Sequence, residues 1–141
     1  MAWHFEHGAD SAAGPHDVWQ RYVDVANWSE WSREGVEWSR LDGPFAVGTR
    51  GTSKPPGSPR LRFTLAAVEP DTMFASEAKL PGARLRFEHV IEPRPPGCRI
   101  THRFTLDGPL ASLYTRFVKK GIERGLPDGV DRLAAIAADR G

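Results

Sequence analysis

Apolar and charged residues alternate through the middle of the chain, from Ala83 to Leu106. Two such runs flank a proline-rich turn at Pro93–Gly97. A period of two residues is typical of strands that bury one face. The pattern therefore predicts an antiparallel hairpin, and its register sets His89 opposite His102 on the apolar face.

Shorter alternating stretches predict five more strands, at Trp3–Gly8, Val36–Leu41, Val47–Lys54, Leu61–Val68 and Met73–Leu80. Extending the hairpin register across them gives an apolar face of three rows. These are Phe63–Ala78–Leu85–Leu106, Leu65–Ser76–Phe87–Phe104 and Ala67–Phe74–His89–His102. We expect this face to be buried, because a slip of one residue would turn every apolar side chain outward.

The opposite face of the same strands is charged. It carries two predicted cross-strand ion pairs, Glu77–Arg86 and Glu88–Arg103. Arg62, Lys79 and Arg84 form a basic row with Asp107 at its end. Such a row is ordinarily solvated, but it could also bind an anion.

Helices are predicted on either side of the strands. Gly14 and Pro15 fit the start of one short helix, and Asn27, with Glu30 three residues later, predicts the start of a second. Gly108 and Pro109 begin a long C-terminal pattern with helical spacing that continues to Ala137. We expect Pro127 to kink or interrupt this helix.

Composition narrows the classes of protein. The 141 residues predict one domain, residues 1–141, which can bury a sizeable core. Cys98 is the single cysteine, so no internal disulfide is possible, and the absence of an apolar leader favours a cytoplasmic protein. A formal charge of +1 argues against nucleic acid, and no apolar run is long enough for a membrane helix. A monomer and a homodimer both remain open.

Five segments together resemble the START-like (SRPBCC) superfamily, in its polyketide cyclase/dehydrase-like branch. They are VWQRYVDVANWSEW at 18–31, LDGPFAVGTRG at 41–51, LPGARLRFEH at 80–89, THRFTLDGPL at 101–110 and GIERGLPDGV at 121–130. The resemblance implies an α+β helix-grip fold. In that fold a seven-stranded antiparallel sheet curves around the C-terminal helix, two short helices lie between strands 1 and 2, and a cavity holds an apolar ligand.

The function expected on this basis is binding of a small hydrophobic or aromatic molecule between the sheet and the C-terminal helix. Strand and helix phase select the pocket residues Trp28, Trp31, Phe63, Leu65, Ser76, Leu85, Phe87, His89, His102, Phe104, Phe117 and Gly121. Fold alone does not choose a reaction, so an interaction module without a ligand also stays open.

His89 and His102 are the candidate catalytic residues. Two adjacent imidazoles facing an apolar space cannot easily both be charged, so at least one is expected to be neutral and could act as a base. That chemistry would suit a cyclase or dehydratase. Alternatively, the pair bonds internally and only tolerates burial. With His7 they could form a set of three histidine ligands for zinc. The spacing of these residues is not that of a local metal motif, so we expect no metal and no cofactor.

Overall fold

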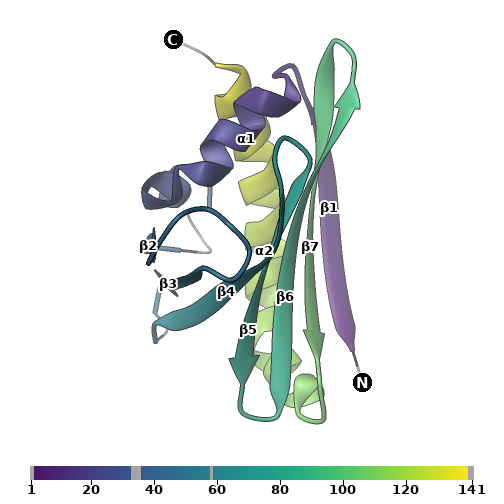
Figure 1. Ribbon diagram of the computed structural model, residues 1–141. Coiled ribbons are helices and arrows are strands. Elements are labelled where there is room, and N and C mark those ends of the chain that lie inside the picture. Colours follow the sequence, from purple (N-terminus) through teal and green to yellow (C-terminus); the bar gives the residue numbers. More distant parts are fainter. Residues whose placement is uncertain (1, 33–35, 58, 140–141) are drawn as a thin grey trace.

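A computed structural model describes residues 2–32, 36–57 and 59–139. Its centre is a seven-stranded antiparallel sheet with the strand order β1-β7-β6-β5-β4-β3-β2. The sheet curves, and the long helix α2 lies along its concave side, while α1 closes one end (Figure 1). The arrangement confirms the predicted helix-grip fold.

The elements follow one another in the predicted order. The strands are β1 Trp3–Ser11, β2 Trp38–Leu41, β3 Arg50–Lys54, β4 Leu61–Glu69, β5 Met73–Leu80, β6 Ala83–Arg94 and β7 Gly97–Asp107. The helices are α1 Pro15–Val23, the 3-10 helix η1 Val25–Glu30, and α2 Ala111–Ala138. The bounds of β5 agree with the prediction, whereas β3 begins at Arg50, because Val47 lies in an exposed loop.

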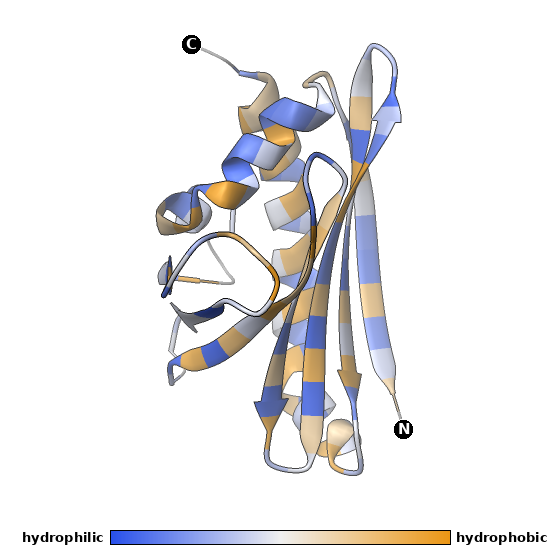
Figure 2. Ribbon diagram, viewed as in Figure 1, coloured by the Kyte–Doolittle hydropathy of each residue, from blue (hydrophilic) through white to orange (hydrophobic). Residues whose placement is uncertain are grey.

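The register of the central strands confirms most of the predicted rows. Leu65, Ser76, Phe87 and Phe104 follow one another across β4 to β7, and His89 lies opposite His102. β1 continues the histidine row, since His7 pairs with His102. Apolar and polar positions alternate visibly along these strands (Figure 2).

Between β4 and β5 the predicted register is wrong at one place. An irregularity between Leu65 and Ala67 shifts the pairing, so that Val68 and not Ala67 lies opposite Phe74. In the other direction the predicted register holds as far as Thr64 and Glu77, where the pairing ends, one step before Phe63 and Ala78. A bulge of this kind increases local twist, which lets the two strands part at this end.

The outer face keeps one of the two predicted ion pairs. Nη1 of Arg86 lies 2.6 Å from Oε2 of Glu77, across β5 and β6. Glu88 and Arg103 are opposite in register, but Glu88 contacts Arg86 at 3.3 Å, and Arg103 contacts Glu6 at 3.9 Å.

The first two helices differ in kind. Gly14 caps α1 with Pro15 in its first turn, as predicted. The second is the 3-10 helix η1, and Asn27 lies inside it with non-helical dihedral angles, so Asn27 does not cap it. Val25 is the buried residue of η1, and Val18, Trp19 and Tyr22 are those of α1.

Helix α2 runs through Pro127 without interruption. It packs mainly on β1 and β7, and its buried residues lie mostly in the second half: Ala111, Leu126, Gly129, Val130, Leu133, Ala134 and Ala137. Glycines recur every four residues on this helix, at 121, 125 and 129. Gly129 lies close to the backbone of Trp31, whereas Gly121 faces open space. No helix in the described residues is long and apolar enough to span a membrane.

Candidate functional site

A pair of histidines lies in the core, on the concave face of the sheet. The rings of His89 on β6 and His102 on β7 have centroids 4.5 Å apart, and the two residues are 5% and 2% exposed. Strand alternation brings both imidazoles inward, since they occupy the same phase as Phe87 and Phe104. The pairing predicted from the sequence is therefore present and buried.

Tyr22 joins this pair from α1. Its hydroxyl lies 2.8 Å from Nε2 of His102, and its side chain is fully buried. With both groups neutral, we assign the hydroxyl as the donor and Nε2 as the acceptor. Sequence reasoning did not single out Tyr22. Its spacing of four residues from Val18 marked it as inward-facing, but nothing in the sequence related α1 to β7.

Burial keeps these three groups uncharged. It lowers the pKa of His102 to about 3, with a further contribution from the neighbouring charge of His7. Burial also lowers the pKa of His89 well below its ordinary value; repulsion from His102 adds to this, while a backbone hydrogen bond with Phe74 opposes it. The pKa of Tyr22 is raised well above its ordinary value by burial and, secondarily, by Cys98. The site therefore consists of neutral hydrogen-bonding groups at pH 7.

His89 is held between aromatic rings. Phe74 stacks on it with centroids 4.0 Å apart and planes 3° apart, and Phe87 stacks with centroids 4.5 Å apart. Within the described residues, Nδ1 of His89 has no hydrogen-bond partner. A buried polar atom without a partner costs about 1–3 kcal/mol, so this nitrogen is a polar group whose hydrogen bond the described residues leave unmade.

Two tryptophans from η1 and the residue after it pack over the same rings. Trp28 stacks on Phe63 at 6.0 Å and on Phe74 at 5.9 Å, and the ring of Trp31 lies 5.6 Å from that of His102. Like His89, Trp31 has a buried ring nitrogen with no partner in the described residues. The structure thus gathers several of the predicted pocket residues into one aromatic cluster, with Leu65 and Phe104 buried beside it.

Further along the concave face the covering is incomplete. Ser76, Leu85 and Phe87 face inward on β5 and β6 but are only half-buried. On α2, the side that carries the buried residues also carries Tyr114, Val118 and Ile122, and these are half-buried as well. Two largely apolar walls therefore remain partly open to solvent.

The predicted helix phase is wrong for the two pocket residues on α2. Phe117 is 79% exposed, and Gly121 is exposed with no atom within 4 Å of the position that a Cβ would take. At 100° per residue, Val118 and Ile122 point toward the sheet instead. In the first half of this helix apolar residues occur as adjacent pairs, Leu113–Tyr114 and Phe117–Val118, so their spacing alone fitted either phase.

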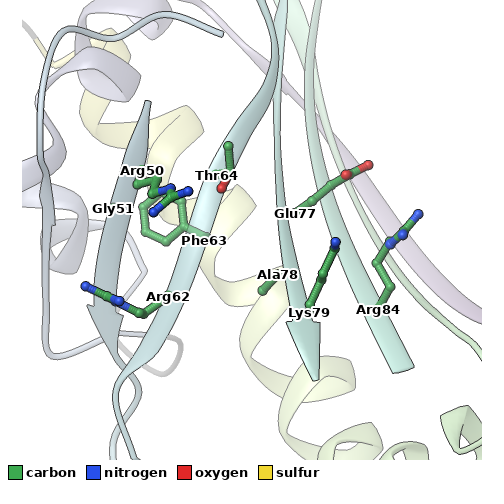
Figure 3. A pocket seen from close by; sticks show the side chains of 9 residues that line it. All are labelled: Arg50, Gly51, Arg62, Phe63, Thr64, Glu77, Ala78, Lys79 and Arg84. Atoms are coloured by element: carbon green, nitrogen blue, oxygen red, sulfur yellow. The ribbon is translucent and has the colours of Figure 1, made fainter. Parts of the chain in front are cut away.

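A hollow of about 410 Å³ opens where β4 and β5 part, which we call the β4–β5 hollow (Figure 3). It is lined by Arg50, Gly51, Arg62, Phe63, Thr64, Glu77, Ala78, Lys79 and Arg84. The predicted basic row is thus part of its rim. A second hollow, of about 340 Å³, adjoins it and shares Lys79 and Arg84.

His7 is turned toward α2. Its Nε2 lies 3.0 Å from Oδ1 of Asp131, and its side chain is one-third exposed. Across residues 2–32, 36–57 and 59–139, no three histidine, cysteine or carboxylate side chains come together in a way that could hold a metal ion.

The curved sheet, the long helix and the apolar concave face define a protein of the helix-grip class. A family model described as polyketide cyclase/dehydrase and lipid transport matches residues 2–138. The chain belongs to this family. No curated protein matches the sequence.

Solved structures with the same fold share little sequence with this chain. A truncated norcoclaurine synthase from Thalictrum flavum superposes with a TM-score of 0.76 at 15% identity, covering 100% of this chain and 96% of that one. The aromatase/cyclase Zhui from Streptomyces sp. R1128 gives 0.78 at 12% identity, covering 97% and 94%. The di-domain aromatase/cyclase StfQ of the steffimycin pathway gives 0.79 at 14% identity, covering 99% and 52%. At these identities the likeness shows the fold alone.

Proposed function

We propose that this protein binds a small hydrophobic or aromatic molecule between the concave face of its sheet and the first half of α2. The observation that carries the proposal is the half-buried state of both walls, with Leu85 and Phe87 on the sheet and Val118 and Ile122 on the helix. Protein interiors are normally packed as densely as organic crystals. Apolar walls that solvent still reaches leave room for an apolar guest.

Burial of that surface would supply the driving force. Each Å² of apolar surface removed from water contributes roughly 25 cal/mol, so a ligand that covers both walls gains affinity without any specific contact. The aromatic cluster at the deep end favours a flat ligand, because rings stack on rings at little cost in conformational entropy.

The histidine row would orient the ligand. Nδ1 of His89 lacks a partner in the described residues, so a ligand polar atom reaching it gains a hydrogen bond without breaking one. Nε2 of His102 is already bonded to Tyr22. We therefore assign the orienting role to His89 and a supporting role to His102.

Catalysis of the cyclase or dehydratase kind is the second candidate. It is favoured by the Tyr22–His102 hydrogen bond, which places an acid beside a base. The pKa of His102, about 3, counts against it, because a general base works best when its pKa lies near the working pH. In a cyclisation or dehydration assay, His89→Gln and His102→Gln with unchanged turnover would exclude this function.

Native mass spectrometry of the purified protein tests ligand binding directly, since a retained small molecule adds its mass to the chain. A second measurement uses N-phenyl-1-naphthylamine, a neutral aromatic probe whose fluorescence rises in apolar surroundings. We expect saturable binding at micromolar concentration.

A matched pair of variants locates the binding space. Val118→Trp fills the side of α2 that faces the sheet and should weaken binding of the probe at least 10-fold. Leu113→Trp adds the same ring at a position that is 47% exposed and should leave binding unchanged. Absence of both a retained molecule and probe binding would overturn the proposal, as would equal effects of the two variants.

A further inference from the structure

Four cations surround the β4–β5 hollow. Arg50 and Arg62 lie on the β3–β4 side of the gap, and Lys79 and Arg84 lie on the β5–β6 side (Figure 3). None of these four forms an ion pair or hydrogen bond of its side chain within the described residues. All four are exposed, so water and salt screen much of their mutual repulsion, and an anion among them would be attracted by each.

The carboxylate at the hollow offsets these charges only in part. Glu77 is engaged by Arg86 at 2.6 Å. Burial lowers the pKa of Arg86, but hydrogen bonds and charge attraction from Glu77 and Glu88 outweigh it and raise the pKa overall. Asp107 lines the adjoining hollow, where its Oδ1 accepts the backbone N–H of Gly108.

The floor of the hollow is apolar and belongs to the inner face. Phe63 and Ala78 are 6% and 3% exposed, point inward by strand phase, and yet line the hollow. Gly51 makes room for the ring of Phe63, because a Cβ there would lie 2.5 Å from the ring. Beneath a cationic rim on the outer face, the gap between the strands thus ends on buried apolar side chains of the inner face.

We propose that the β4–β5 hollow binds the anionic group of the ligand, and that the ligand is therefore an organic carboxylate or phosphate with an apolar body. This inference rests on the proposed function, because the apolar body would occupy the space between the sheet and α2. The volume, about 410 Å³, lies within the range of small-molecule sites. Guanidinium and ammonium groups match both kinds of oxyanion.

Two probes that differ chiefly in charge test the inference. 1-Anilinonaphthalene-8-sulfonate carries a sulfonate on the scaffold of the neutral N-phenyl-1-naphthylamine. We expect the sulfonate to bind at least 10-fold more tightly. Raising the salt concentration from 50 to 500 mM should weaken binding of the sulfonate probe but not of the neutral probe, because salt screens exposed charges.

Charge-removing variants locate the anion. Arg62→Gln with Lys79→Gln should lower the affinity for the sulfonate probe about 10-fold and leave the affinity for the neutral probe unchanged. Arg50→Gln with Arg84→Gln, an independent pair at the same rim, should act in the same way. Arg103→Gln with Lys120→Gln removes the same charge from exposed positions outside the hollow and should change neither probe.

Competition identifies the head group. Decanoate and decyl phosphate should displace the sulfonate probe better than decanol, and the stronger of the two assigns a carboxylate or a phosphate. Equal displacement by decanol, or equal losses in the rim and control variants, would overturn the anion site while leaving ligand binding intact. Failure of both naphthyl probes to bind would instead count against the proposed function and, with it, this inference.

Discussion

The hydroxyl of Tyr22 meets Nε2 of His102 at 2.8 Å, in a part of the core where neither residue is more than 2% exposed. This hydrogen bond joins α1 to β7 through two residues that lie 80 positions apart in the sequence. It gives Nε2 of His102 a hydrogen-bond partner and holds α1 over the row that contains His89 and His102.

Replacing Tyr22 by Phe should destabilise the protein by about 1–3 kcal/mol, because Nε2 of His102 would remain buried without a partner. Urea unfolding measures the change. Tyr114→Phe is the control: its hydroxyl donates to the carbonyl of Pro81 at an exposed position, where water can take its place, so the loss should stay below about 1 kcal/mol. Equal losses in the two variants would contradict the importance of the Tyr22 bond.

Stability should fall as the solution is acidified from pH 6.5 to 5. The folded-state pKa of His102 is about 3, below the 6.5 of an unperturbed histidine, so in this range the unfolded chain binds a proton that the folded chain excludes. Each histidine with such a lowered pKa reduces the free energy of unfolding by up to about 1.4 kcal/mol per pH unit below pH 6.5. The pKa of His89 is lowered too, and this adds to the slope.

The double variant His89→Gln, His102→Gln separates this effect from other titrations. Its free energy of unfolding should vary less between pH 6.5 and 5 than that of the unaltered protein, whatever its absolute value. An unchanged slope would show that the two histidines are not the cause.

Two glycines on α2 should respond in opposite ways to replacement by alanine. At Gly121 a methyl group meets nothing within 4 Å, so the better helix propensity of alanine should stabilise the protein by about 0.5–1 kcal/mol. At Gly129 the new Cβ would lie 3.3 Å from the carbonyl oxygen of Trp31, which should cancel or reverse that gain. Thermal unfolding of the two variants provides the comparison.

Removing the carboxylate of Glu77 should strengthen anion binding. Glu77→Gln takes a negative charge from the lining of the β4–β5 hollow and leaves Arg86 less neutralised, so the affinity for 1-anilinonaphthalene-8-sulfonate should rise about 2- to 5-fold. Glu92→Gln makes the same change in charge at an exposed position outside the hollow and should have little effect.

The sequence predicted the parts of the fold that depend on alternation. The hairpin of β6 and β7, and with it the histidine pair, follows from a two-residue period on either side of a proline-rich turn. The charged pair Glu77–Arg86 follows from the same register.

The missed features depend on contacts between distant segments. The irregularity between Leu65 and Ala67 has no local signal in the sequence. The predicted register therefore places Ala67 opposite Phe74, where the structure has Val68. The apolar residues of α2 occupy most of its circumference, and only the packing of Leu126 and Leu133 on the sheet selects Val118 over Phe117 as inward-facing. The contact of Tyr22 with His102 likewise requires α1 to be placed in space.

The early end of the β4–β5 ladder leaves an edge in the middle of the sheet. Both the N–H and the carbonyl of Leu65 bond on the side of β3, so by strand alternation the N–H groups of Arg62 and Thr64 face β5. Thr64 has Glu77 opposite, whereas Arg62 lies beyond the last pair, as does Lys79 on the other strand. The amide of Arg62 should therefore exchange with deuterium faster than that of Thr64 and become protected when an anion fills the gap, which would make one residue both a charge and a backbone donor for the same guest.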